Sequence, residues 1–193
     1  MRAQAHALEG IIAALIVLLG LFFALQAVTV TPLTASLAQE HVADQGQAAA
    51  TGTLTAAQEN GDLRPTLLYW NSSAVNFHGT TSQGFCVGGG LPTAFGGMLN
   101  ESFDPRRLVF NVNLVYIDSS GDRQRRALVR SGEPPADVVV ATRTVTLYDD
   151  DRLRDASGKP TNTRLDNGSY FVPDIGSGAV YNVVEIEVVV WQG

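Results

Sequence analysis

The longest uncharged stretch of the chain lies close to its start and constrains the fold more than any other feature. After Glu9 no Asp, Glu, Lys or Arg occurs before Glu40, and residues 11–25 are continuously apolar. A helix rises about 1.5 Å per residue, so residues 8–30 would reach roughly the 30 Å thickness of a bilayer core. We therefore expect a transmembrane helix over residues 8–30, preceded by a short cytoplasmic leader-like segment, residues 1–7.

The charges on either side of this stretch predict its orientation. Arg2 precedes it, and Glu40 and Asp44 follow it. Positive residues stay on the cytoplasmic side, so we expect a single pass through the cell membrane with the N-terminus in the cytoplasm and the C-terminal part outside. A removable secretory signal is disfavoured because the apolar stretch is too long. A plain single-pass anchor fits its length.

The part after the apolar stretch divides into a stalk and a head. Residues 31–60 are rich in Ala and Gln, and they predict a helical stalk with interruptions, the first of them at Pro32. The dipeptide Asn60-Gly61 is a typical helix stop. Residues 61–193 predict an extracytoplasmic β-rich domain. The expected fold class is α+β, with a long N-terminal transmembrane and stalk helix and an antiparallel β-sheet head.

Alternating or β-branched stretches mark the strands of this sheet. The expected strands are residues 108–117, 123–130, 137–148 and 181–191, with a short strand at 66–70. Residues 71–106 are long and aperiodic, and their Gly-rich part, residues 79–97, predicts a functional or mobile loop whose role the sequence leaves open. Within it lies the one cysteine, Cys86, which is expected to be a small apolar filler.

The composition and the motifs argue against several classes of function. Residues 61–193 carry 12 Lys and Arg against 15 Asp and Glu, so a nucleic-acid partner is disfavoured. The three histidines have no metal-ligand spacing, and no nucleophile or phosphate-loop motif occurs. The acidic run at residues 149–151 is expected to be a solvated turn. We therefore expect no enzyme activity, no metal and no cofactor.

Three Asn-x-Ser sequons fall in predicted loops of the domain placed outside the cell. They begin at Asn71, Asn100 and Asn167. Each is a candidate acceptor for N-glycosylation.

The N-terminal residues also resemble a known type of leader. Gln4-Ala-His-Ala-Leu-Glu9 follows a basic residue and a small residue, as in archaeal class III signal sequences. The resemblance implies that a prepilin peptidase cuts between Ala3 and Gln4. Glu9 would then be the sixth mature residue, whereas the common pattern has the acid at the fifth. In that family the acid is expected to meet the free amino terminus of a neighbouring subunit.

The whole chain resembles the haloarchaeal type IV pilin-like membrane proteins of uncharacterised function. The resemblance rests on that leader and on four further segments, Ala24-Leu-Gln-Ala27, Val30-Thr-Pro-Leu33, Val145-Thr-Leu-Tyr-Asp149 and Tyr181-Asn-Val-Val184. The predominance of arginine over its one lysine, Lys159, fits a salt-adapted source.

The resemblance implies a minor pilin or pseudopilin that assembles with itself or with other pilin-like subunits. Its N-terminal helices would pack through apolar contacts and through small residues such as Gly20 and Ala24. The alternative is a membrane-anchored extracytoplasmic domain that binds a partner or supports the envelope without entering a filament.

Overall fold

The structure is a computed structural model that divides into two compact units, Met1–Val42 and Ala43–Gly193. It describes the backbone of residues 2–87, 90–167, 169–175 and 178–193, and the side chains of these residues except 2–8 and 26–42. We call the second unit the head.

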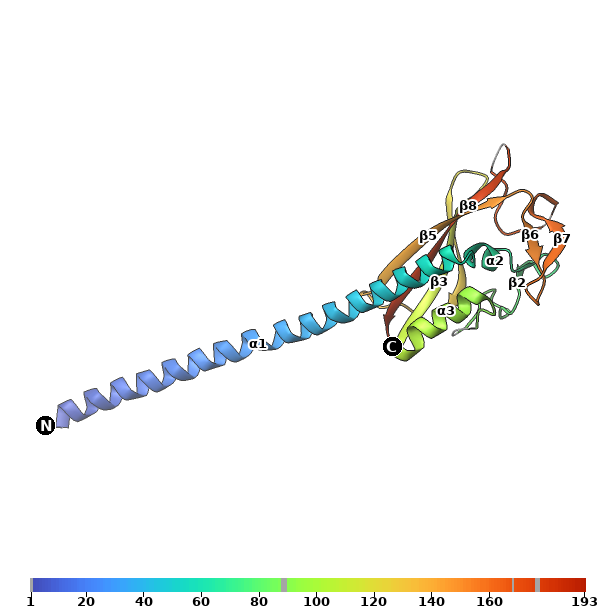
Figure 1. Cartoon of the computed structure of the whole chain (residues 1–193). Coiled ribbons are helices and arrows are strands. Elements are labelled where there is room, and N and C mark those ends of the chain that lie inside the picture. The colour runs from blue at the N-terminus through green and yellow to red at the C-terminus, as the bar shows by residue number, and fades with distance from the viewer. Residues whose placement is uncertain (1, 88–89, 168, 176–177) are drawn as a thin grey trace. The chain divides into compact units, whose positions relative to one another are not determined.

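The helix α1 (Arg2–Glu59) begins in the first unit and ends in the head (Figure 1). It continues past Pro32, so the expected interruptions of the stalk are not observed. Its end is the predicted one, because Gly61 adopts a φ of +77° that favours glycine. The Gly61 N–H donates to the Gln58 carbonyl at 3.1 Å, which satisfies one of the last carbonyls of the helix.

The expectation of a transmembrane stalk helix is wrong. Within the part of the chain whose side chains are described, no helix has a stretch long and apolar enough to cross a bilayer.

The head is built on a four-stranded antiparallel sheet with the strand order β4-β3-β8-β5. The strands are β3 (Leu108–Ile117), β4 (Arg123–Arg130), β5 (Val139–Tyr148) and β8 (Val180–Gln192), so the four long strands predicted from the sequence are confirmed. The β3–β4 turn is fixed by Asp118, whose Oδ1 accepts from the Ser120 and Asp122 N–H groups at 2.9 and 3.0 Å.

Shorter elements complete the head. The helix α2 (Leu63–Leu67) takes the first two residues of the segment where a strand at 66–70 was expected, and only Trp70 of that segment belongs to a strand, so that prediction is wrong. Its two buried leucines face the core with a helical spacing that is too short to be recognised as a pattern. The remaining elements are β1 (Trp70–Asn71), β2 (Asn76–Phe77), β6 (Arg152–Arg154), β7 (Pro160–Arg164), η1 (Asp104–Arg106) and η2 (Leu165–Asn167).

The long loop expected at residues 71–106 contains a helix, α3 (Ala94–Phe103). Thr93 is its N-cap, and the Thr93 hydroxyl accepts from the Gly96 N–H at 3.2 Å. Phe95, Leu99 and Phe103 form its buried face. The glycine pair at 96–97 disguised this helix in the sequence, because glycine disfavours helix interiors.

The core lies between the inner face of the sheet and the helical turns that cover it. The Thr53 hydroxyl on α1 donates to Ser102 Oγ on α3 at 2.7 Å, so the two helices lie side by side (Figure 1). On β8, Val184, Ile186 and Val188 are fully buried on this inner face. Their alternation with Glu185 and Glu187 is the one predicted from the sequence.

An aromatic cluster extends the core beyond the sheet. The Trp70 ring is 1% exposed, and its centroid lies 5.1 Å from that of Phe77 and 5.3 Å from that of Phe171. Its Nε1–H donates to the Ser169 carbonyl at 2.7 Å. The Arg126 guanidinium stacks 5.0 Å above the same ring, and burial lowers the pKa of this guanidinium.

Tyrosines that are wholly or partly buried make the head sensitive to alkali. Burial raises the pKa of Tyr69, Tyr170 and Tyr181 above their ordinary value of 10.0, most strongly for Tyr170. Above about pH 10 the folded head therefore binds more protons than the unfolded chain, and its stability falls as the pH rises.

We expect Tyr170→Phe to make this alkaline decline shallower. The same change removes the hydrogen bond from the Tyr170 hydroxyl to the Leu67 carbonyl (2.9 Å), which lowers the free energy of unfolding at pH 7 by about 1 kcal/mol. Urea unfolding at pH 7 and at pH 11 measures both effects. An equally steep decline in the variant would contradict the account of Tyr170.

Candidate assembly surface

The most exposed apolar surface of the described residues lies on α1 within the first unit. Eleven large apolar side chains of this stretch are 50–69% exposed. We call residues 11–25 the apolar segment. The eleven side chains are Ile11, Ile12, Leu15, Ile16, Val17, Leu18, Leu19, Leu21, Phe22, Phe23 and Leu25.

These side chains surround the helix on all sides. Leu15, Leu18 and Leu19 recur three and four residues apart, which is one helical face, while Ile16 and Val17 point to other faces. Soluble monomers rarely expose contiguous apolar patches larger than a few hundred Å², and a helix that is apolar all round is normally covered on every side. The apolar segment is therefore a surface that needs a partner.

Small residues interrupt this surface at the two positions expected to pack helices together. A Cβ placed on Gly20 would meet no heavy atom within 4 Å, so the backbone at this position is open to a neighbour. Ala24, one turn further, is also exposed. Two helices can approach closely where such small residues lie on one face.

Of the three residues expected to take part in processing or assembly, Ala3, Gln4 and Glu9, the structure describes the side chain of Glu9 alone. Glu9 lies on α1 directly before the apolar segment, and its side chain is exposed. The side chains of Ala3 and Gln4 lie outside the described residues, although their backbone belongs to α1. The structure therefore leaves cleavage between Ala3 and Gln4 as a prediction.

The three sequons lie in different environments. Asn71 precedes the turn between β1 and β2, and its Oδ1 accepts from the Ser73 and Ala74 N–H groups at 3.0 and 3.1 Å. Asn100 lies inside α3, which is a poor place for a modified side chain. The Nδ2 of Asn167 donates to Asp166. The three positions belong to three different elements, β1, α3 and η2.

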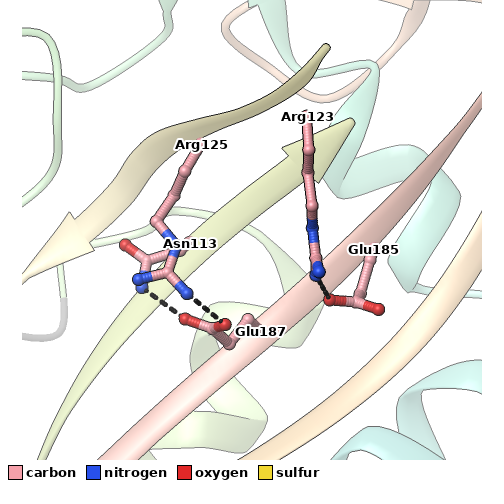
Figure 2. Close-up of polar contacts among 5 residues, drawn as sticks. All are labelled: Asn113, Arg123, Arg125, Glu185 and Glu187. Carbon is pink, nitrogen blue, oxygen red and sulfur yellow. Dashed lines mark hydrogen bonds and ion pairs between the residues drawn. The ribbon is translucent and has the colours of Figure 1, made fainter. Parts of the chain in front are cut away.

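The outer face of the sheet carries a polar network that joins three strands (Figure 2). The Glu187 carboxylate on β8 accepts from Arg125 on β4 at 2.6 Å and from Asn113 on β3 at 2.9 Å. Its side chain is only 8% exposed, whereas that of Arg125 is 61% exposed. Arg123 and Glu185 form a second, more exposed pair at 2.7 Å. Both pairs hold β4 in register with β8, and a structural role accounts for them.

Among the residues that the structure describes, the grooves of the head carry no recognisable catalytic set. A groove of about 580 Å³ is lined by Asp62, Arg154 and the N-terminal turn of α3.

Burial and the nearby Asp174, Asp166 and Asp150 raise the pKa of Asp149 in the acidic turn. Within the described residues, no group of three His, Cys, Asp or Glu side chains is placed to hold a metal ion.

The polar network on the outer face was not predicted from the sequence. The residues of one strand do not by themselves determine which residues of the neighbouring strand lie opposite them. The sequence places four arginines within residues 123–130 and two glutamates at positions 185 and 187. Which arginine meets which glutamate depends on the pairing of β4 with β3 and of β3 with β8. The signal available in the sequence was charge: arginines on β4 and glutamates on β8 have opposite signs and can pair across the outer face of the sheet.

These features define a class: a protein with an exposed apolar helical segment at its N-terminal end and an α-helix-covered antiparallel sheet in its head. The match of residues 2–190 to a family of unknown function (DUF7288) shows that the chain belongs to that family. No curated protein matches the chain. No solved structure matches it either.

Proposed function

We propose that the protein is a structural subunit that assembles with other copies of itself through the apolar segment. The observation that carries the proposal is the exposure of eleven large apolar side chains on all sides of one helix. No charged side chain occurs between Glu9 and Glu40 to oppose contact between such helices. The segment thus has the composition of a helix in the interior of an assembly.

The size of the exposed surface favours several neighbours over one. Burying the remaining area of the eleven side chains would contribute on the order of 10 kcal/mol. Association itself costs about 4–15 kcal/mol, and one neighbouring helix covers only one side of the segment. A bundle in which each helix is surrounded therefore gains much more than a dimer of helices.

The finer assignment, to a minor pilin or pseudopilin, rests on the sequence resemblance of the leader and of the four segments named above. It includes cleavage between Ala3 and Gln4 by a prepilin peptidase and an extracytoplasmic position of the head. Glu9 directly before the apolar segment supports it, since an acid at the start of the packed helix can meet the amino terminus of a neighbour. The competing function, an unassembled binding or envelope domain, predicts no contact between apolar segments.

Photo-crosslinking from the apolar segment tests the proposal. Gly20→Cys places a thiol on the open face of α1, where a cysteine-reactive benzophenone can be attached to the full chain. Cys86 is 1% exposed and burial raises its thiol pKa, so it is expected to remain unlabelled. Irradiation should then produce covalent multimers joined within residues 11–25, as located by mass spectrometry.

The matched control is Gly52→Cys, at another exposed glycine of α1 whose Cβ would also meet no atom within 4 Å. It lies in the head, so we expect far fewer crosslinks from it. Equal yields from both positions, or no multimers from Gly20→Cys, would contradict assembly through the apolar segment.

A further inference from the structure

The two edges of the four-stranded sheet differ in how they are protected. Unpaired strand edges invite pairing with another chain, and proteins usually cover or charge them. At the β4 edge, the Cys86 N–H donates to the Leu128 carbonyl and the Arg130 N–H donates to the Cys86 carbonyl, both at 2.9 Å. The same strand carries four arginines among its eight residues. The β4 edge is therefore covered at residues 128–130 and charged along its length.

The β5 edge has neither protection. Residues 139–147 pair with β8 on one side, and on the other side no backbone hydrogen bond joins them to another element of the described chain. The strand contains no proline and one charged residue, Arg143. The Arg143 guanidinium donates to Thr55 Oγ1 at 2.7 Å and to the Thr142 carbonyl at 3.0 Å, so it is held against its own head. Apart from the Thr142 carbonyl, which accepts from Arg143, the β5 edge presents backbone donors and acceptors without a partner among the described residues.

A groove of about 470 Å³ runs beside the second half of this edge. Thr144, Thr146 and Tyr148 line it from the strand, and Arg64 and Pro65 of α2 line the opposite side. Strand addition commonly combines main-chain hydrogen bonds along an edge with pockets that receive alternate side chains. The β5 edge offers both.

We propose that β5 pairs antiparallel with β5 of a second copy, so that the two sheets become continuous. We favour β5 of a second copy as the strand that binds this edge, because it has a free edge of the same length. Pairing around a two-fold axis also satisfies both edges at once. An axis at Thr142 or Thr144 places Arg143 opposite Ala141 or Val145 rather than opposite itself. The inference concerns the head alone and does not depend on assembly through the apolar segment.

One exposed apolar side chain fits this arrangement. Val140 is 43% exposed at the start of β5. With the axis at Thr142 it lies opposite Thr144 of the other copy, and with the axis at Thr144 it lies opposite Tyr148. Both of these residues line the groove, so either register brings Val140 next to it.

Cysteine crosslinking in the full chain tests the pairing. All variants are made in a Leu18→Glu chain. The charge that this change places in the apolar segment removes contacts between helices. The test of the β5 pairing can therefore fail independently of the proposed function. Thr142→Cys and Thr144→Cys each introduce an exposed thiol at a candidate axis position. Directly opposed residues of an antiparallel pair have Cβ atoms about 4.5–5.5 Å apart, close to disulfide geometry. We expect mild oxidation to give a disulfide-linked dimer from one of the two.

The control thiol is Gln124→Cys, which is exposed on the β4 edge and should give no dimer. In addition, Thr144→Glu without any new cysteine should weaken dimerisation of the Leu18→Glu chain by about tenfold, because like charges then face each other across the axis. Dimers of equal yield from both edges, or a chain that stays monomeric with neither threonine position crosslinked, would overturn the pairing.

Discussion

Gly96→Ala is expected to destabilise the head by about 3 kcal/mol, a large effect for adding one methyl group. A Cβ at this position would lie 1.9 Å from the backbone oxygen of Leu91 and 2.9 Å from its carbonyl carbon. These are backbone atoms, so no side-chain rotation can relieve the overlap. The first turn of α3 would have to move away from residue 91, and the buried Phe95 and Leu99 would move with it.

The neighbouring glycine provides the control. A Cβ on Gly97 would meet no atom within 4 Å, and the residue is exposed in the same helix. Gly97→Ala should therefore stabilise the head by about 0.5–1 kcal/mol, because alanine loses less backbone entropy than glycine in a helix. Urea unfolding followed by circular dichroism measures both variants. Similar midpoints for the two would show that the approach of Leu91 to α3 is not as tight as described.

This pair of glycines also explains where sequence reasoning failed in the head. In the sequence, Gly96 and Gly97 looked alike, and both argued for a loop. In the structure, Gly96 is required by a long-range contact, and Gly97 is merely tolerated. A contact between segments cannot be inferred from the residues of one of them.

The elements that were predicted correctly have signals within their own residues. The period-two alternation of β3 and β8 and the β-branched content of β5 are local, and so is the Asn60-Gly61 stop. The short elements α2 and β1 have too few residues to show a period. The strand order β4-β3-β8-β5 brings together strands far apart in the chain, so the unprotected β5 edge became visible only in the structure.

The candidate assembly surface was only partly predictable. The absence of charge over residues 10–39 marked the apolar segment from the sequence alone. Its interpretation as a membrane span was wrong, because no helix among the residues with described side chains has a stretch long and apolar enough to cross a bilayer. The exposure of the segment around its whole circumference is the structural observation that replaces that interpretation.

Leu18→Glu is the second change with a large expected effect, and it acts on assembly rather than on folding. Leu18 is 63% exposed near the middle of the apolar segment, and glutamate is a good helix former, so α1 should remain intact. In a packed bundle the new carboxylate would be buried without a partner, which costs several kcal/mol for every copy. We expect the higher assemblies to be lost while the circular dichroism spectrum stays unchanged.

Ile175→Glu is the control, because it introduces the same charge at an exposed apolar residue of the head. It should assemble as the unmodified chain does. The difference between the two variants then separates an effect of the apolar segment from a general effect of added negative charge.

The most direct measurement is sedimentation equilibrium of the full chain in a density-matched non-ionic detergent, for the unmodified protein and for Leu18→Glu. Assembly through the apolar segment predicts a mass of many chains for the unmodified protein and of no more than two chains for the variant. An unmodified protein no larger than two chains, or a variant that sediments as the unmodified protein does, would contradict it.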